Sequence, residues 1–366
     1  MNPTSRLLAV TRHSPSILLL AVAACQSPQP PSPFASSGTF KVENNLTVPV
    51  PAGAKEVKVW FPLPRNEEGQ TVSDLKIEAP AGWKEATDNQ GNHYVHAAVA
   101  SPGEKVVVKT SFTVTRKEQR AIVDPAKTRP LNDAEKKEHT AELAGNTNIV
   151  INDEIKKLAA EIRGTETNPA IVSRKLYDWV LGNVEYWVKD PSKWKASPVG
   201  SSDYCLKNKT GNCTDFHSLW TALARASDIP TRMKYGSLFK PSLDGADKDA
   251  SYHCWPEAWL PGIGWVPNDV AVADIFTAPP ITLDDNNRDR VTLTTANGYK
   301  GPDQTLVDYY FSSLDPRRVT WTLGRDLVFE PKQTASTVNM NAKGYVEVDG
   351  AEFAKFDRKM TFKEVH

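Results

Sequence analysis

The chain has 366 residues, enough for about two or three domains and a sizeable core. Its 44 Lys and Arg residues balance its 44 Asp and Glu residues. This neutrality excludes a general electrostatic attraction to nucleic acid or to an anionic surface, so no nucleic-acid partner is expected. The 27 prolines favour turns and edge strands in an otherwise ordinary globular composition.

Residues 1–25 have the pattern of an export signal peptide. Arg6 and Arg12 precede a short apolar run at 17–24, which is too short to span a bilayer and ends in small residues directly before Cys25. This ending resembles the lipobox of bacterial lipoproteins. The resemblance implies lipidation of Cys25 and anchoring in the cell envelope, at the outer membrane facing the periplasm. The alternative is an ordinary cleaved signal in which Cys25 is incidental.

Residues 26–37 are rich in proline and serine and predict an extended tether. Residues 38–120 then alternate apolar and polar side chains, as in Val57, Val59 and Phe61, with turn signals between the runs. Short alternating strands at this spacing predict an immunoglobulin-like β-sandwich.

Residues 121–150 are charged and weakly patterned and are interpreted as a connecting segment. Helical periodicity follows, first over 155–164 and then from Asn168-Pro169, which is typical of an N-cap with proline at the first helical position. A third helix is predicted to begin near Cys213, after a polar loop at 207–211.

Strand patterns dominate the rest of the chain. They cover 252–260 and 265–272, joined by a turn, and three later runs at 290–295, 318–323 and 345–348. Helices followed by an antiparallel sheet predict an α+β catalytic domain over 151–335, and 336–366 is expected to be a C-terminal β segment.

Cys213 follows Gly211-Asn212 at the expected loop-to-helix junction. Unpaired N–H groups and partial positive charge at a helix N-terminus stabilise a thiolate, and the same N–H groups can donate to an oxyanion on a substrate carbonyl. Gly211 would let a substrate backbone approach closely. The alternative is that Cys213 is a small buried hydrophobic residue, as most free cysteines are.

Two histidines compete as the base for Cys213. His217 lies four residues on, on the same helix face, and is interpreted as a structural histidine bonded to a neighbouring carbonyl. His253 lies on a later strand and has a partner to orient it in Asp269, with Asn268 as the fallback. If residues 260 and 265 pair, Asp269 faces Pro256 rather than His253, so a bulge or wider loop near Pro256 is expected.

Three blocks together resemble the core of the transglutaminase-like superfamily. They are Gly-Asn-Cys-Thr-Asp-Phe-His-Ser-Leu at 211–219, Ala-Arg-Ala-Ser-Asp-Ile-Pro-Thr-Arg at 224–232, and Tyr-His-Cys-Trp-Pro-Glu-Ala-Trp-Leu-Pro-Gly-Ile-Gly-Trp-Val-Pro-Asn-Asp at 252–269. The segment 311–319 also looks like the tail of bacterial members. The resemblance implies a papain-like fold without a cofactor, with Cys213 as nucleophile, His253 as base and Asp269 as the orienting acid.

The remaining cysteines and polar groups have smaller expected roles. If Cys25 is lipidated and Cys213 stays free, parity leaves Cys205 and Cys254 as a disulfide, whereas no CxxC or paired-histidine spacing supports a metal site. Upstream aromatic residues could donate to an oxyanion, namely Tyr186, Trp187 and Trp194. Arg232 and Arg325 are interpreted as structural ion pairs. The acidic run at 284–289 is interpreted as a solvated turn.

The leading functional hypothesis is a cell-envelope thiol hydrolase that acts on peptide or amide bonds through a Cys213 thioester, with peptides, proteins or peptidoglycan stem peptides as substrates. The second is transfer of the same acyl group to an amine, which cross-links. The third is a lipid-anchored binding module without catalysis.

Overall fold

The computed structural model describes residues 31–247, 249, 251–277 and 301–366. The predicted signal peptide, Cys25, the part of the predicted tether before residue 31, the strand expected at 290–295 and the acidic run at 284–289 lie outside these residues. None of the helices within the described ranges combines the length and apolar character that a membrane crossing needs.

The first sheet is antiparallel, in the order β18-β1-β6-β3. Along β1 every second side chain is buried, including Phe40, Val42, Leu46 and Val48, because successive residues of a strand point to opposite faces. The strands of this sheet are β1 (Ser37–Pro49), β3 (Gln70–Glu78), β6 (Lys105–Lys117) and β18 (Asp357–Val365).

The second sheet has the order β15-β4-β5-β2-β16-β17. Its strands are β2 (Glu56–Pro62), β4 (Lys84–Asp88), β5 (His93–Ala100), β15 (Phe329–Glu330), β16 (Tyr345–Val348) and β17 (Ala351–Glu352). Apolar side chains of both sheets share one core, in which Leu46 and Val108 of the first sheet pack with Val59, Val95 and Val346 of the second. The two sheets therefore form a β-sandwich; its immunoglobulin-like type stays a prediction.

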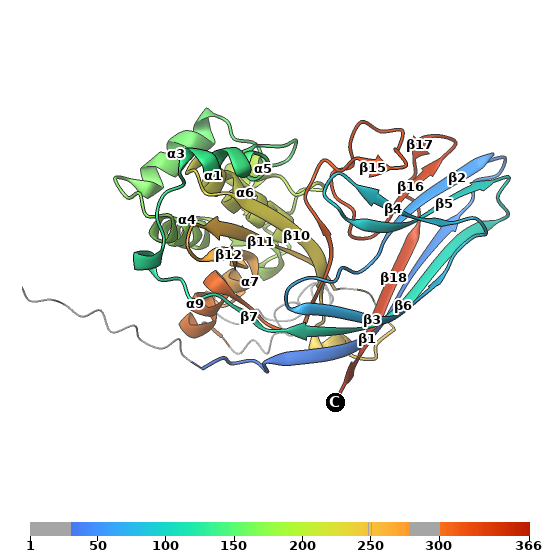
Figure 1. Cartoon of the computed structure of the whole chain (residues 1–366), viewed down its shortest axis with the longest axis horizontal. Helices are drawn as coiled ribbons and strands as arrows, with labels where there is room; N and C mark the ends of the chain where they lie inside the picture. The colour runs from blue at the N-terminus through green and yellow to red at the C-terminus, as the bar shows by residue number, and fades with distance from the viewer. Residues whose placement is uncertain (1–30, 248, 250, 278–300) are drawn as a thin grey trace, which may run out of the picture. The chain divides into compact units, whose positions relative to one another are not determined.

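The end of the chain completes this sandwich. β18 pairs with β1 from Thr39↔Val365 to Thr47↔Asp357, and β16 pairs with β2. Figure 1 shows the red strands β16 and β18 among the blue strands of the N-terminal half. The segment at 336–366 thus contributes strands to both sheets, which begin more than 200 residues earlier in the chain.

The segment at 121–150 is more ordered than its sequence pattern predicts. It contains η1 (Pro125–Lys127), α1 (Asp133–Glu138) and α2 (Thr140–Leu143). At α1, Asn132 accepts from the Glu135 N–H while the Glu135 carboxylate accepts from the Asn132 N–H, a capping box that stabilises this short exposed helix.

Four helices follow: α3 (Asp153–Arg163), α4 (Pro169–Asn183), α5 (Ser202–Asn208) and α6 (Cys213–Ala226). The predicted cap of α4 is confirmed, because the Asn168 side chain accepts from the Ala170 and Ile171 N–H groups. The polar loop predicted at 207–211 is wrong in its first part, since α5 extends to Asn208 and ends there with Lys209 in the left-handed region.

An antiparallel sheet of order β12-β11-β10-β14 packs with these helices. Its strands are β10 (Thr231–Leu238), β11 (Tyr252–Leu260), β12 (Gly264–Pro267) and β14 (Arg318–Leu323). The strand predicted over 265–272 is wrong beyond Pro267, because the chain turns there into helix α7 (Val270–Ile275). The predicted combination of helices with an antiparallel sheet is confirmed.

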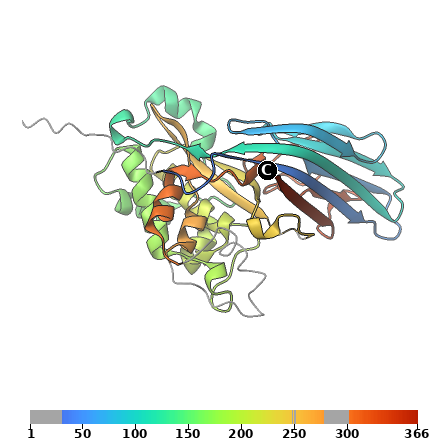
Figure 2. The same cartoon turned by 90° about the horizontal axis from the view of Figure 1, so that it is seen from below.

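Helix α9 (Gln304–Ser312) closes one side of this α+β domain and lies beside α4. The Tyr177 hydroxyl donates to the Val307 carbonyl, and Arg174 pairs with Asp308 at 2.6 Å. Figure 2 shows the orange α9 against the green helices. The short elements are β7 (Gln119–Arg120), β8 (Glu185–Tyr186), η2 (Trp187–Lys189), β9 (Thr210–Gly211), η3 (Pro241–Leu243) and β13 (Ser313–Leu314).

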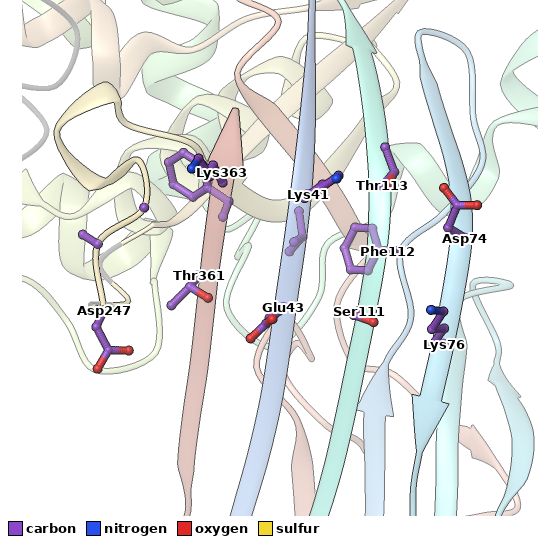
Figure 3. Close-up of a pocket in the computed structure, with 14 residues that line it drawn as sticks. Lys41, Glu43, Asp74, Lys76, Ser111, Phe112, Thr113, Asp247, Thr361 and Lys363 are labelled. Atoms are coloured by element: carbon purple, nitrogen blue, oxygen red, sulfur yellow. The ribbon is translucent and has the colours of Figure 1, made fainter. Parts of the chain in front are cut away.

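A polar groove of about 500 Å³ lies over the face of the sheet β18-β1-β6-β3 (Figure 3). Side chains of opposite charge line it: Lys41, Lys76 and Lys363 with Glu43, Asp74 and Asp247. The charges balance, so this groove does not favour a ligand of either sign.

Candidate active site

Cys213 is the first residue of α6, as predicted. The Asn212 side chain accepts from the Thr214 and Asp215 N–H groups, and the Asp215 carboxylate accepts in return from the Asn212 N–H at 2.9 Å. This capping box fixes the start of the helix and occupies those two N–H groups, which leaves the N–H of Cys213 itself at the helix end. Cys213 is only 4% exposed.

Gly211 serves the protein's own packing rather than a substrate backbone, in contrast to the prediction. A Cβ at this position would lie 2.3 Å from the Cβ of Asp215. The carboxylate of Asp215 needs this space, because it is buried and binds Ser197 and the Ser201 N–H as well as the helix cap. Glycine therefore allows the cap in front of Cys213 to form.

His253 lies on β11 and is fully buried. Its Nε2 is 2.7 Å from Oδ2 of Asp269. Its Nδ1 has no hydrogen-bond partner among the described residues, so this is the ring nitrogen available to a thiol. Figure 1 shows β11 beside helix α6, the element that carries Cys213.

Asp269 reaches His253 because the chain leaves the sheet. β12 pairs Leu260 with Gly264 and ends at Pro267, and Asp269 then acts as the N-cap of α7 by accepting from the Val272 N–H at 3.0 Å. The bulge expected near Pro256 is absent, since β11 pairs without a register shift with both β10 and β12. The strand pairing that would place Asp269 opposite Pro256 rather than His253 therefore does not apply, because Asp269 lies beyond the end of β12.

Asp269 also binds an arginine that the sequence analysis did not single out. Arg318 Nη1 donates to Asp269 Oδ2 at 2.5 Å, and Arg318 Nη2 donates to Asp315 Oδ2 at 2.9 Å. All three residues are buried. Asp315 and Arg318 lie within the segment at 311–319 that resembles bacterial family members, which was the one available signal.

His217 belongs to the same cluster, and its predicted bond to a neighbouring carbonyl is wrong. Its Nε2 lies 3.3 Å from Asp269 Oδ1, and its Nδ1 lies 3.4 Å from the Cys254 sulfur. The ring is fully buried on the same face of α6 as Cys213. Asp269 therefore has a histidine near each of its two oxygens, and Asn268, the alternative orienting group, is not needed in that role.

The disulfide predicted between Cys205 and Cys254 does not form, since both residues are free and buried. The Cys254 sulfur instead lies 3.5 Å from the Thr214 hydroxyl oxygen, beside His217. Cys205 lies on α5 in the apolar core, where burial raises the pKa of its thiol well above the usual value. The disulfide prediction was wrong because it assumed that the two cysteines left after Cys25 and Cys213 must pair.

The electrostatics of the cluster favour a thiolate at Cys213. A hydrogen bond from the Cys254 thiol, and then the charge of His253, hold the pKa of Cys213 well below its usual value, although burial opposes the shift. Burial also opposes protonation of His253, but the charges of Asp269 and Cys213 outweigh it and raise the pKa of His253 to about 9. At any pH between the pKa of Cys213 and the pKa of His253, the pair exists as thiolate and imidazolium.

Asp269 supplies the fixed negative charge. Burial favours its protonated form, but the charges of His253 and Arg318 hold the pKa of Asp269 well below its usual range. Burial lowers the pKa of His217, so at neutral pH its ring is uncharged whereas that of His253 is charged. A buried thiolate with an oriented imidazolium can attack a carbonyl carbon and then protonate the leaving group.

Of the three aromatic oxyanion candidates, Tyr186 lies at the cluster. Burial, and then the charge of Cys213, raise the pKa of the Tyr186 hydroxyl well above its usual value, so it stays a proton donor. The Trp194 ring lies under Lys193 at 4.7 Å, and Trp187 packs against the apolar core. These contacts account for both tryptophans structurally.

The two arginines expected to form structural ion pairs differ. Arg232 pairs with the buried Glu257 at 2.6 Å, as predicted. Arg325 instead donates to backbone carbonyls of residues 199 and 200 and to the Ser218 hydroxyl, so it secures the loop before α5 by neutral hydrogen bonds.

Comparison with known proteins gives three findings. Residues 156–270 match the family model described as the transglutaminase-like superfamily. An uncharacterized protein of Haemophilus influenzae is 26% identical over 335 residues, which cover 85% of this chain and 86% of that protein. A crystal structure of a proposed cysteine protease from Cytophaga hutchinsonii has a TM-score of 0.54 and 18% identity, over 90% of this chain and 99% of that one. The last likeness shows the fold alone.

Proposed function

Because residues 156–270 belong to the transglutaminase-like superfamily, we propose that this protein is a thiol-dependent hydrolase that cleaves amide or peptide bonds through an acyl-enzyme on Cys213. The observation that carries the proposal is the Asp269–His253 contact at 2.7 Å beside Cys213, since it leaves one imidazole nitrogen for the thiol.

In the first half-reaction the Cys213 sulfur, ionised by proton transfer to His253, attacks the substrate carbonyl carbon. The carbonyl electrons move to oxygen, and the Cys213 N–H at the start of α6 is positioned to donate to this oxyanion. The tetrahedral intermediate collapses, the C–N bond breaks, and the amine leaves with the proton that His253 returns. A thioester to Cys213 remains.

In the second half-reaction neutral His253 takes a proton from water, whose oxygen attacks the thioester carbonyl. The C–S bond breaks, the carboxylic acid leaves, and the thiolate–imidazolium pair is restored. Asp269 holds the imidazole orientation through both halves and stabilises its charged form. The proposal does not involve a metal or a cofactor.

The substrates we propose are envelope peptides, proteins or peptidoglycan stem peptides. The test incubates the full-length protein with cell-wall fragments and with a panel of protein substrates, in the presence of a labelled primary amine. New carboxyl ends without label support hydrolysis. Label in the products supports transamidation, the second candidate, which shares the thioester. Products that persist with the Cys213→Ala protein contradict both, and absence of any product leaves a binding module as the better account.

The cellular location is a separate proposal, which rests on the small residues before Cys25. We propose that Cys25 carries lipid after removal of residues 1–24 and tethers the folded part to the envelope. Mass spectrometry of the N-terminal peptide should show an acylated Cys25, and Cys25→Ala should release the protein from the membrane fraction. An unmodified N-terminus at any other residue contradicts the lipid anchor.

A further inference from the structure

Arg318 occupies a special place at the cluster, because it binds the same carboxylate oxygen as His253. Asp269 Oδ2 accepts from Arg318 Nη1 at 2.5 Å and lies 2.7 Å from His253 Nε2. The other oxygen, Oδ1, accepts from the Val272 N–H at 3.0 Å and lies 3.3 Å from His217 Nε2. Each oxygen thus has two partners, and the carboxylate cannot rotate without breaking several contacts.

The guanidinium of Arg318 is itself fixed on its other side. Its Nε and Nη2 both donate to Asp315 Oδ2, at 3.1 and 2.9 Å, and its carbon lies 5.3 Å from the Trp255 ring and 5.6 Å from the Tyr310 ring. Tyr310 also donates its hydroxyl to Asp315 and accepts the Asp269 N–H at its carbonyl. A buried planar cation held this way transmits a fixed geometry to Asp269.

The local sheet structure shows how Arg318 reaches this position. Gly236 of β10 lies opposite His253 of β11, and a Cβ there would lie 2.1 Å from the Val319 carbonyl oxygen of β14. The β10–β14 register shifts between Tyr235 and Gly236. The missing Cβ at Gly236 lets β14 pack closely against β10, whose other edge pairs with His253 of β11, and Arg318 is the first residue of β14.

From these contacts we infer that Arg318 is a positioning residue, which sets the orientation of Asp269 and through it the orientation of His253 toward Cys213. The inference rests on the proposed function and deepens it. An arginine with only a structural role would need no partner beyond the ion pair with Asp315. Arg318 also contacts Asp269 Oδ2, the oxygen that binds His253, and this contact links it to the reacting pair.

The titratable or charged groups that face Asp269 are His253 from β11, neutral His217 from α6 and Arg318 from β14, with Asp315 behind Arg318. Loss of the Arg318 cation leaves two buried carboxylates near one imidazolium. Asp269 is then free to reorient or to take up a proton, and His253 loses its fixed acceptor. The thiolate at Cys213 becomes harder to form.

The test measures alkylation of Cys213 by iodoacetamide in the full-length protein, as a function of pH, by mass spectrometry of the Cys213 peptide. Wild type, Arg318→Met, Arg318→Lys and Asp315→Asn are compared. We expect the alkylation midpoint of Arg318→Met to move upward by about one pH unit or more, which is about tenfold less thiolate at a pH below both midpoints. Arg318→Lys should shift the midpoint less than Arg318→Met does. Lysine keeps the positive charge but lacks the planar guanidinium that binds two carboxylates.

Arg116 offers the control, because it is equally buried but pairs with Glu67, whose other partners are Lys234 and Thr320 rather than Asp269. Arg116→Met should lower the melting temperature and leave the alkylation midpoint unchanged. An unshifted midpoint in folded Arg318→Met overturns the inference, as does a downward shift. If Arg318→Met does not fold, Arg318→Lys and Asp315→Asn decide, and unshifted midpoints in both overturn it. Ordinary thiol reactivity in wild type would instead contradict the proposed function itself.

Discussion

His217 Nδ1 lies 3.4 Å from the sulfur of Cys254. A second histidine and a second cysteine therefore lie against the proposed catalytic pair. Both are fully buried. Their roles should differ from those of His253 and Cys213, and this difference can be tested.

Replacement of the two histidines should separate the base from its neighbour. We expect His253→Ala to lower kcat/KM by about 10²–10⁴-fold, the usual range for loss of a general acid–base group. His217→Gln should cost less than about tenfold, because burial keeps His217 neutral and a glutamine amide can still donate to Asp269. Steady-state rates on one substrate decide the comparison, and equal losses would contradict the assignment of His253 as the base.

Removal of the Cys254 thiol should raise the pKa of Cys213. The hydrogen bond from Cys254 is the largest influence that lowers this pKa, so Cys254→Ala should slow alkylation of Cys213 in acid, while Cys254→Ser, which keeps a donor, should slow it less. Cys205→Ala serves as the control, because Cys205 lies on α5 in the apolar core. If Cys205→Ala and Cys254→Ala have the same effect, a specific hydrogen bond is not the cause.

The pH dependence of kcat/KM should have two limbs. On the acidic side activity rises with pH as the Cys213 proton leaves, at a pKa well below that of an ordinary thiol. On the basic side activity falls as His253 loses its proton near pH 9, because the leaving amine then has no acid. A single limb that rises near the ordinary thiol pKa of about 8.5 would contradict a preformed thiolate.

Phe362 on β18 should be essential for stability. Its ring stacks on Phe239 at 4.4 Å and meets Phe40 edge-on at 5.9 Å. Phe362→Ala should therefore lower the free energy of unfolding by about 3–5 kcal/mol. The neighbouring Lys363 lines the polar groove (Figure 3), and Lys363→Ala should change it by less than about 0.5 kcal/mol. Denaturant unfolding measures both, and equal losses would contradict the packing of β18.

Much of the fold could be predicted from local patterns. Helix α6 begins at Cys213, as its apolar periodicity after a polar loop indicates. The strands at 318–323 and 345–348 were also predictable from alternation. The sheet that each strand joins was not, because the pairing of β18 with β1 depends on contacts between opposite ends of the chain.

The candidate site was predictable where family motifs carried it and not where tertiary contacts decide it. The resemblance named Cys213, His253 and Asp269, yet strand periodicity placed Asp269 on a strand, where it caps a helix instead. Arg318 was missed because an arginine in a strand is ordinarily a surface residue, and only the folded chain buries it against Asp269.

The most direct measurement of the central claim is the ultraviolet thiolate absorbance of the full-length protein at neutral pH. It is taken as the difference between wild type and Cys213→Ser, with His253→Ala as the comparison. The account predicts one thiolate in wild type that is lost in His253→Ala. Equal absorbance in wild type and Cys213→Ser would show a protonated Cys213 and contradict the account.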